Sequence, residues 1–166
     1  MTIKRRRRII RTRRTSLGIT LVAAISFLAG LTDAIGLQLS GDFVSFMTGN
    51  TTRAAISFEQ GDYAHALVLA GAIATFVIGN ALGIIVAHLF ERRIFAVLVT
   101  VGLLLTLASA LTAPDMAIWR FNAVVLAMGL VNAAVEHIEG LPIGLTYVTG
   151  ALSRLGRGIG RMMLGE

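Results

Sequence analysis

Four long apolar stretches constrain the fold of this chain more than any other feature of its sequence. They are Leu17–Leu39, Ala64–Phe90, Ile94–Ala113 and Met116–Val135. A helix needs about 20 mostly apolar residues to cross the hydrocarbon core of a bilayer. A soluble protein does not repeat such lengths four times, because most of its helices must show a polar face to water. We therefore predict an all-α integral membrane protein with about four full transmembrane helices.

The composition agrees with a membrane protein and excludes several other classes. Charged residues make up 14% of the chain and hydrophobic residues 55%, whereas soluble domains carry about 25% charged residues. The absence of cysteine excludes disulfides, thiolate metal sites and a cysteine nucleophile. We recognise no Ser-His-Asp constellation, phosphate loop, dinucleotide fingerprint or metal-binding histidine spacing. We therefore expect neither an enzyme nor a cofactor.

The positive charge is concentrated at the N-terminus. Residues 1–14 hold eight basic residues and no acidic one, whereas the other residues hold seven arginines against nine acidic residues. Such a segment can be a nucleic-acid arm, an export signal or a determinant of membrane orientation. We favour the third, because the first apolar stretch has full span length and more spans follow. We expect a cytoplasmic tail over residues 1–14 that contacts anionic lipid, a membrane domain over residues 15–166, and no nucleic-acid partner.

The segment Phe43–Phe58 is too short and too polar for an ordinary span. At its centre stand Thr48, Gly49, Asn50, Thr51, Thr52 and Arg53. A re-entrant or broken segment that is buried against protein tolerates such a backbone. If the segment re-enters, the basic turn at residues 91–93 lies on the same side as the N-terminus. If it spans, this turn lies on the opposite side. The positive-inside rule favours re-entry.

Two strings recur in the same order along the chain. Ala29–Ala34 aligns with Met128–Ala133 at an offset of 99, and Phe46–Arg53 aligns with Tyr147–Arg154 at an offset of 101. We predict an internal repeat, with one unit over about residues 17–113 and a partial unit over about residues 116–166. Three spans separate the starts of the units under the re-entrant interpretation, so the second unit is inverted. Inverted repeats with interrupted helices are typical of transporters.

The repeated strings also resemble a known family. The strings at residues 28–34, 47–53, 129–134 and 146–150 are similar to those of the YoaK-like family of bacterial membrane proteins. The resemblance covers about residues 17–160. It implies about six spans and a bacterial inner membrane, but no biochemical function. This chain departs from the pattern after its second Thr-Gly string, where equivalents of Asp62–Thr112 are missing. Either the chain is shortened, or a homo-oligomer completes the second unit.

Asp33 and the Thr48–Arg53 string are the first candidates for a functional site. An ionisable group within a span usually faces the protein interior with a partner. Asp33 is therefore either a titratable functional group or a structural one, at the membrane interface or paired with Arg53. Thr and Asn are helix-capping residues, so a half-helix that begins in this string would point free N–H groups and Arg53 at an anion. Alternatively, these side chains merely satisfy broken backbone within the membrane.

The second unit offers equivalent candidates. Asn132 stands where Asp33 stands in the first unit, and we expect it to form hydrogen bonds between helices. Thr149, Gly150 and Arg154 correspond to Thr48, Gly49 and Arg53. We expect a small-solute transporter or permease whose site lies at the Thr-Gly strings. The alternative is a non-transporting membrane interaction or structural protein, in which the same strings serve packing.

Overall fold

The computed structural model describes residues 3–136 and 147–165. These residues form six α-helices and one short 3-10 turn, without a strand among them. The elements are α1 (Ile3–Ser40), α2 (Met47–Glu59), α3 (Tyr63–Leu89), α4 (Arg93–Ala110), η1 (Pro114–Met116), α5 (Ala117–Glu136) and α6 (Tyr147–Met163). Four candidate spans lie at Ala23–Ser40, Tyr63–Leu89, Arg93–Ala110 and Pro114–Ala133. The prediction of an all-α membrane protein with four full spans is confirmed.

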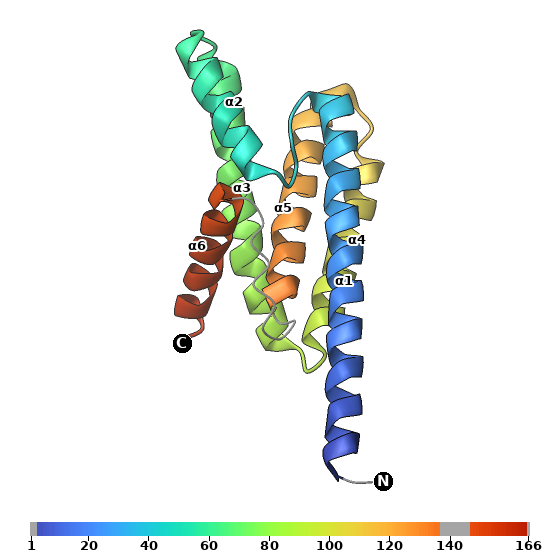
Figure 1. Ribbon diagram of the computed structural model, residues 1–166. Coiled ribbons are helices and arrows are strands. Elements are labelled where there is room, and N and C mark those ends of the chain that lie inside the picture. Colours follow the sequence, from blue (N-terminus) through green and yellow to red (C-terminus); the bar gives the residue numbers. More distant parts are fainter. Residues whose placement is uncertain (1–2, 137–146, 166) are drawn as a thin grey trace.

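The basic N-terminal segment is not separated from the first span. Helix α1 begins at Ile3 and continues without a break to Ser40. Arginine is a good helix former, and the sequence places no proline within this segment. Figure 1 shows that the N-terminal part of α1 extends well beyond the other helices. The basic residues therefore stand on a helical extension of the span.

Helix α3 lies at the centre of the bundle and contacts α2, α4, α5 and α6. Glycines permit its closest contacts. A Cβ added at Gly79 would lie 2.5 Å from the carbonyl oxygen of Leu126, and one added at Gly83 would lie 2.5 Å from the Cβ of Ala133. On the α6 side, a Cβ at Gly156 would lie 2.5 Å from the carbonyl oxygen of Val77. Close backbone approach is the usual way in which membrane helices pack without a hydrophobic driving force.

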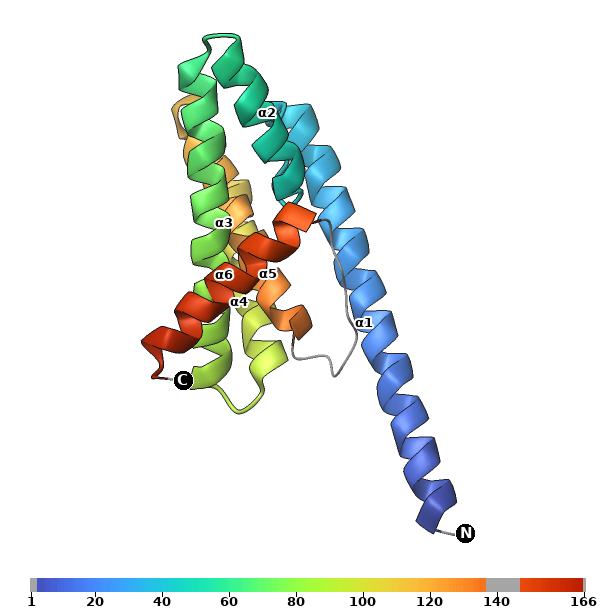
Figure 2. The ribbon, with the colours of Figure 1, turned by 60° about the vertical axis from the view of Figure 1, so that its left-hand side comes forward.

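The chain re-enters after α1, as the charge distribution favoured. Figures 1 and 2 show that α1 runs away from the N-terminus, that residues 41–46 turn back, and that α2 then returns to the end where α1 stopped. Helix α3 next runs the full length in the opposite direction. The turn at residues 90–92 therefore lies at the end of the molecule that also holds the N-terminus.

Helix α6 stands in the predicted second unit where α2 stands in the first. It begins at mid-height, beside the start of α2, and runs toward the opposite end of the molecule (Figures 1 and 2). Helix α5, which precedes it, runs opposite to α1. Both the full helix and the half-helix of the second unit are thus reversed relative to those of the first, as an inverted repeat predicts.

Candidate functional site

The two half-helices begin at the same place. The backbone N–H of Thr48 in α2 donates to Oγ1 of Thr149 in α6 at 3.3 Å, and the N–H of Thr149 donates to Oγ1 of Thr48 at 3.4 Å. Thr149 is buried. The first N–H groups of a helix have no partner within it, so these hydroxyls satisfy them from the opposing helix. The two threonines are 101 residues apart, which is the offset of the repeated strings.

The expected role of the Thr48–Arg53 string as a set of helix caps needs correction. Phe46 occupies the N-cap of α2 and forms no side-chain capping bond. Thr48 lies one residue inside the helix and caps α6 instead. The hydroxyls of Thr51 and Thr52 donate to the carbonyls of Met47 and Thr48 within α2. The hydrogen bonds of these two hydroxyls are therefore made within α2.

Asp33 anchors the re-entrant loop at residues 41–46. Its Oδ1 accepts the N–H groups of Val44 and Ser45 at 2.8 and 2.7 Å, and its Oδ2 accepts the hydroxyl of Ser45 at 2.6 Å. A loop within a membrane must find partners for its backbone inside the protein. The carboxylate supplies them through charge-assisted hydrogen bonds.

Arg53 pairs with Asp42 rather than with Asp33, which corrects the sequence-based pairing. Its Nε lies 3.7 Å from Oδ1 of Asp42, and it also donates to the carbonyl oxygen of Gly41. The Asp42 side chain is 6% exposed and that of Arg53 is 38% exposed. Asp33 thus binds residues 44–45 of the loop, whereas Arg53 binds residues 41–42.

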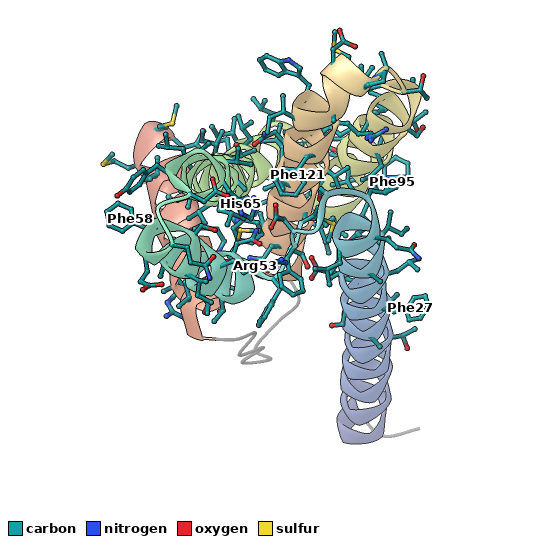
Figure 3. All side chains as sticks on the ribbon, turned by 90° about the horizontal axis from the view of Figure 1, so that it is seen from above. Phe27, Arg53, Phe58, His65, Phe95 and Phe121 are labelled. Atoms are coloured by element: carbon teal, nitrogen blue, oxygen red, sulfur yellow. The ribbon has the colours of Figure 1, made fainter. Side chains whose placement is uncertain are left out.

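A second partner of Asp42 was not foreseen from the sequence. Nε2 of His65 lies 3.0 Å from Oδ2 of Asp42, and Nδ1 of His65 lies 3.1 Å from the hydroxyl of Ser57. Figure 3 shows Arg53 and His65 close together, on α2 and α3 respectively. The prediction that the chain has no Ser-His-Asp constellation was therefore wrong, because Ser57, His65 and Asp42 are connected in the structure. The three residues come from separate segments, so no spacing along the sequence could have predicted that they meet.

This constellation is a structural tie between α2, α3 and the loop. Ser57 is 7% exposed, and its hydroxyl is turned into the contact between α2 and α3. A serine nucleophile needs an open side from which a substrate carbonyl can approach, together with donors for the oxyanion. The one feature that could have suggested the tie is Asp62. It caps α3 by accepting the N–H of His65, which marks His65 as a first-turn residue.

Asn50 and Gly49 shape the start of α2. The Asn50 side chain is fully buried, and its amide binds both the N–H and the carbonyl oxygen of Phe43, at 3.1 and 2.7 Å. A Cβ at Gly49 would lie 2.6–2.7 Å from the rings of Phe46 and Phe43. Glycine is therefore required because both rings fold over the first turn of the helix.

The candidates of the second unit are placed differently. Asn132 donates to Oδ1 of Asn80 at 3.0 Å and to the hydroxyl of Ser153. It thus joins α5 to α3 and α6, as expected for a residue that bonds helices together. Gly150 is half-buried beside Thr149, while Arg154 lies exposed on α6. Of the eleven predicted site residues, Thr48 and Thr149 are the pair whose polar groups meet across the two units.

The sequence matches the family model described as "Protein of unknown function (DUF1275)" over residues 21–166. The chain belongs to this family. It is also 57% identical to the UPF0700 transmembrane protein RA0705 of Rhizobium meliloti (strain 1021), over 99% of this chain and 72% of that protein. No solved structure matches it. These relatives confirm the resemblance to a YoaK-like family of membrane proteins, and they assign no activity to this DUF1275 member.

Proposed function

We propose that this DUF1275 member belongs to a small-solute transporter or permease whose site lies where α2 and α6 begin. The observation that carries the proposal is the reciprocal contact between Thr48 and Thr149. Two half-helices of opposite direction start there, inside the bundle. Interrupted helices are costly within a bilayer unless they serve a cavity or are covered by protein, and paired interrupted helices are a recurring device of transporters.

The chemistry of the junction favours a solute with a negative group. Each helix N-terminus carries a partial positive charge and N–H donors, and the two ends face each other. The hydroxyls of Thr48 and Thr149 add two neutral ligands. An anionic or zwitterionic solute is therefore the expected class.

Solute binding requires the threonine pair to separate. The N–H groups of Thr48 and Thr149 are each occupied by the opposing hydroxyl, so the described arrangement is closed at this point. Two neutral hydrogen bonds contribute only about 1 kcal/mol each, so a solute can replace them. The start of α2 is held in place by the contacts of the loop with Asp33, Asn50 and Arg53. These three residues therefore act on the proposed site by positioning α2.

Proteoliposome flux tests this proposal. Vesicles with the protein would be challenged with chloride, acetate, glycine and, as a neutral control, glycerol. We expect the protein to accelerate the entry of at least one charged solute. The double variant that combines Thr48→Val and Thr149→Val should change that rate at least tenfold. Thr106→Val is the matched control, because the Thr106 hydroxyl donates to Gly102 within exposed α4. Equal entry with and without protein for all charged solutes would reject the proposal.

A non-transporting membrane interaction protein is the second candidate. It is favoured by the internal satisfaction of Asp33, Asn50 and the threonine pair, which leaves these groups serving only the fold. In that case, substitutions at the threonines lower the melting temperature and flux equals that of empty vesicles. The two functions are therefore separated by measuring flux and stability on the same variants.

We also propose an inner-membrane location with the N-terminus in the cytoplasm. The basic residues of α1 and the turn holding Arg92 and Arg93 lie at the same end of the molecule, as the positive-inside rule requires of a cytoplasmic face. The basic extension of α1 would then contact anionic lipid headgroups. The division into units at about residues 17–113 and 116–166, and completion of the second unit by a homo-oligomer, belong to the same proposal.

A further inference from the structure

A cavity of about 310 Å³ lies between α1, α4 and α5, at the end of the bundle opposite the N-terminus. Its wall is mostly apolar, and its larger side chains are Ile35, Leu39, Val44, Leu105, Phe121 and Val124. Helix α1 contacts α5 but not α4 among the described residues. The cavity therefore has a lateral side between two helices that face the bilayer.

The hydroxyls in the wall are already satisfied by the protein. Thr32 donates to the carbonyls of Leu28 and Ala29, Ser40 donates to Gly36, and Ser109 donates to Thr106. A water molecule needs two to four polar partners to occupy a cavity. The apolar part of the wall does not offer them, so the occupant is apolar over most of its length.

Among the residues that the structure describes, Arg120 is the one charged residue in the wall. It is half-buried in the first turn of α5, and its Nη1 donates to the carbonyl oxygen of Leu111 at 3.3 Å. Within residues 3–136 and 147–165, no carboxylate lies within ion-pair distance of it. A guanidinium has five donors, so most of its donors have no partner among these residues. A cation in this position is costly without an anion, and the N-terminus of α5 adds positive charge.

We propose that this cavity holds an acyl chain of an anionic phospholipid whose headgroup phosphate binds Arg120. The apolar wall suits the chain, and the guanidinium at the membrane-boundary end of the cavity suits the phosphate. A phospholipid brings both parts in the required order from the bilayer itself. The site lies at the end of the bundle away from the basic residues of α1, and it is independent of the threonine junction.

Tryptophan quenching by brominated lipid tests the site directly. The chain has a single tryptophan, so Trp119→Phe removes all tryptophan fluorescence. In that variant, Phe121→Trp places the one fluorescent reporter in the cavity wall. The protein would be placed in bilayers of phosphatidylcholine in which dibromo-acyl phosphatidylglycerol or dibromo-acyl phosphatidylcholine replaces a fixed fraction. We expect the phosphatidylglycerol to bind about fivefold more strongly at this reporter, and Arg120→Gln to reduce the preference to about one. Leu105→Trp gives the same measurement from α4 if the first reporter does not fold.

Matched controls separate this site from ordinary lipid contact. Figure 3 shows Phe121 within the group of helices and Phe95 on the outside of α4. Phe95 is 65% exposed, so Phe95→Trp should report no preference between the two lipids. Arg93→Gln removes an exposed arginine at the other end of α4 and should leave the preference at the cavity unchanged.

Three results would overturn the proposal. Equal quenching by both lipids at the cavity reporters would show a non-selective lipid contact. Stronger quenching by a brominated free fatty acid than by phosphatidylglycerol would assign the cavity to a carboxylate ligand. Absence of quenching by every brominated chain would show that a protein segment fills the cavity, either from this chain or from a second copy.

Discussion

Thr48 and Thr149 each donate a backbone N–H to the hydroxyl of the other, at 3.3 and 3.4 Å. The pair joins the first turn of α2 to the first turn of α6, at the point where two half-helices of opposite direction meet. Each hydroxyl accepts an N–H group of the opposing helix, which has no partner within that helix. The contact thus ties the two repeat units together, and it must open before any ligand reaches the helix ends.

Each threonine of the pair should contribute separately to stability. Thr48→Val or Thr149→Val removes one accepting hydroxyl and leaves an N–H of the opposing helix unpaired. We expect each to lower the free energy of unfolding by about 1 kcal/mol. The double variant should cost about the sum of the two, because each substitution removes a different hydrogen bond. Denaturant unfolding in detergent measures the cycle, with Thr48→Ser and Thr149→Ser as variants that retain the hydroxyl. Serine variants that cost as much as the valine variants would contradict the hydroxyl contacts.

Asp33 should matter chiefly for the re-entrant loop. Asp33→Ala leaves the N–H groups of Val44 and Ser45 without an acceptor, at a cost of roughly 1–3 kcal/mol in unfolding free energy. Asp33→Asn keeps one acceptor oxygen and should lie between alanine and the wild type. Thermal unfolding followed by circular dichroism gives the ranking. Ser26→Ala, an exposed change on the same helix, serves as the control, and a cost equal to that of Asp33→Ala would count against the anchoring role.

Two glycines of α3 should respond oppositely to alanine. At Gly79 a Cβ would lie 2.5 Å from the backbone of α5, so Gly79→Ala forces the helices apart and should cost about 1–3 kcal/mol. At Gly71 no atom lies within 4 Å of the added Cβ, so Gly71→Ala should stabilise the helix by up to about 1 kcal/mol. Melting temperatures in one detergent compare the two. Similar shifts would mean that α3 and α5 are not in close contact.

Single cysteines should report the path of the chain. The sequence contains no cysteine, so Gln60→Cys, Asp115→Cys and Glu91→Cys each introduce one label site. The turn after α2 and the turn before α5 lie at one end of the molecule, and the turn after α3 lies at the other (Figure 1). A membrane-impermeant maleimide on oriented vesicles should therefore label Gln60→Cys and Asp115→Cys from the same side, and Glu91→Cys from the opposite side. Labelling of Gln60→Cys and Glu91→Cys from one side would exclude re-entry.

Features that depend on local composition could be read without coordinates. The four spans were predicted to within a few residues, because the thickness of the hydrocarbon core imposes a length and a composition on each. The close contact at Gly79 and Gly83 agrees with their spacing, since small residues four positions apart let helices approach. The offset between the repeated strings identified Thr48 and Thr149 as equivalents, although not as neighbours.

Contacts between distant segments could not be read in this way. Asp33 and Arg53 bind different parts of the same six-residue loop. Only the path of the loop in space decides that Asp33 binds Val44 and Ser45, whereas Arg53 binds Asp42. His65 joins Asp42 to Ser57 for the same reason. The partner of a polar group within a membrane is whichever donor or acceptor the fold brings near, because water is excluded as an alternative.

Hydrophobic length, charge asymmetry and internal similarity are properties of order along the chain. From them the sequence predicted a helical membrane protein, and it favoured a re-entrant segment and an inverted repeat. The tertiary structure alone decided which side chains face one another. It turned two capping threonines into a pair that closes the junction of α2 and α6, and it placed Arg120 at the end of an apolar cavity. The physical reason is that hydrogen bonds and ion pairs act over a few ångströms, and in this chain those distances join residues up to about a hundred positions apart.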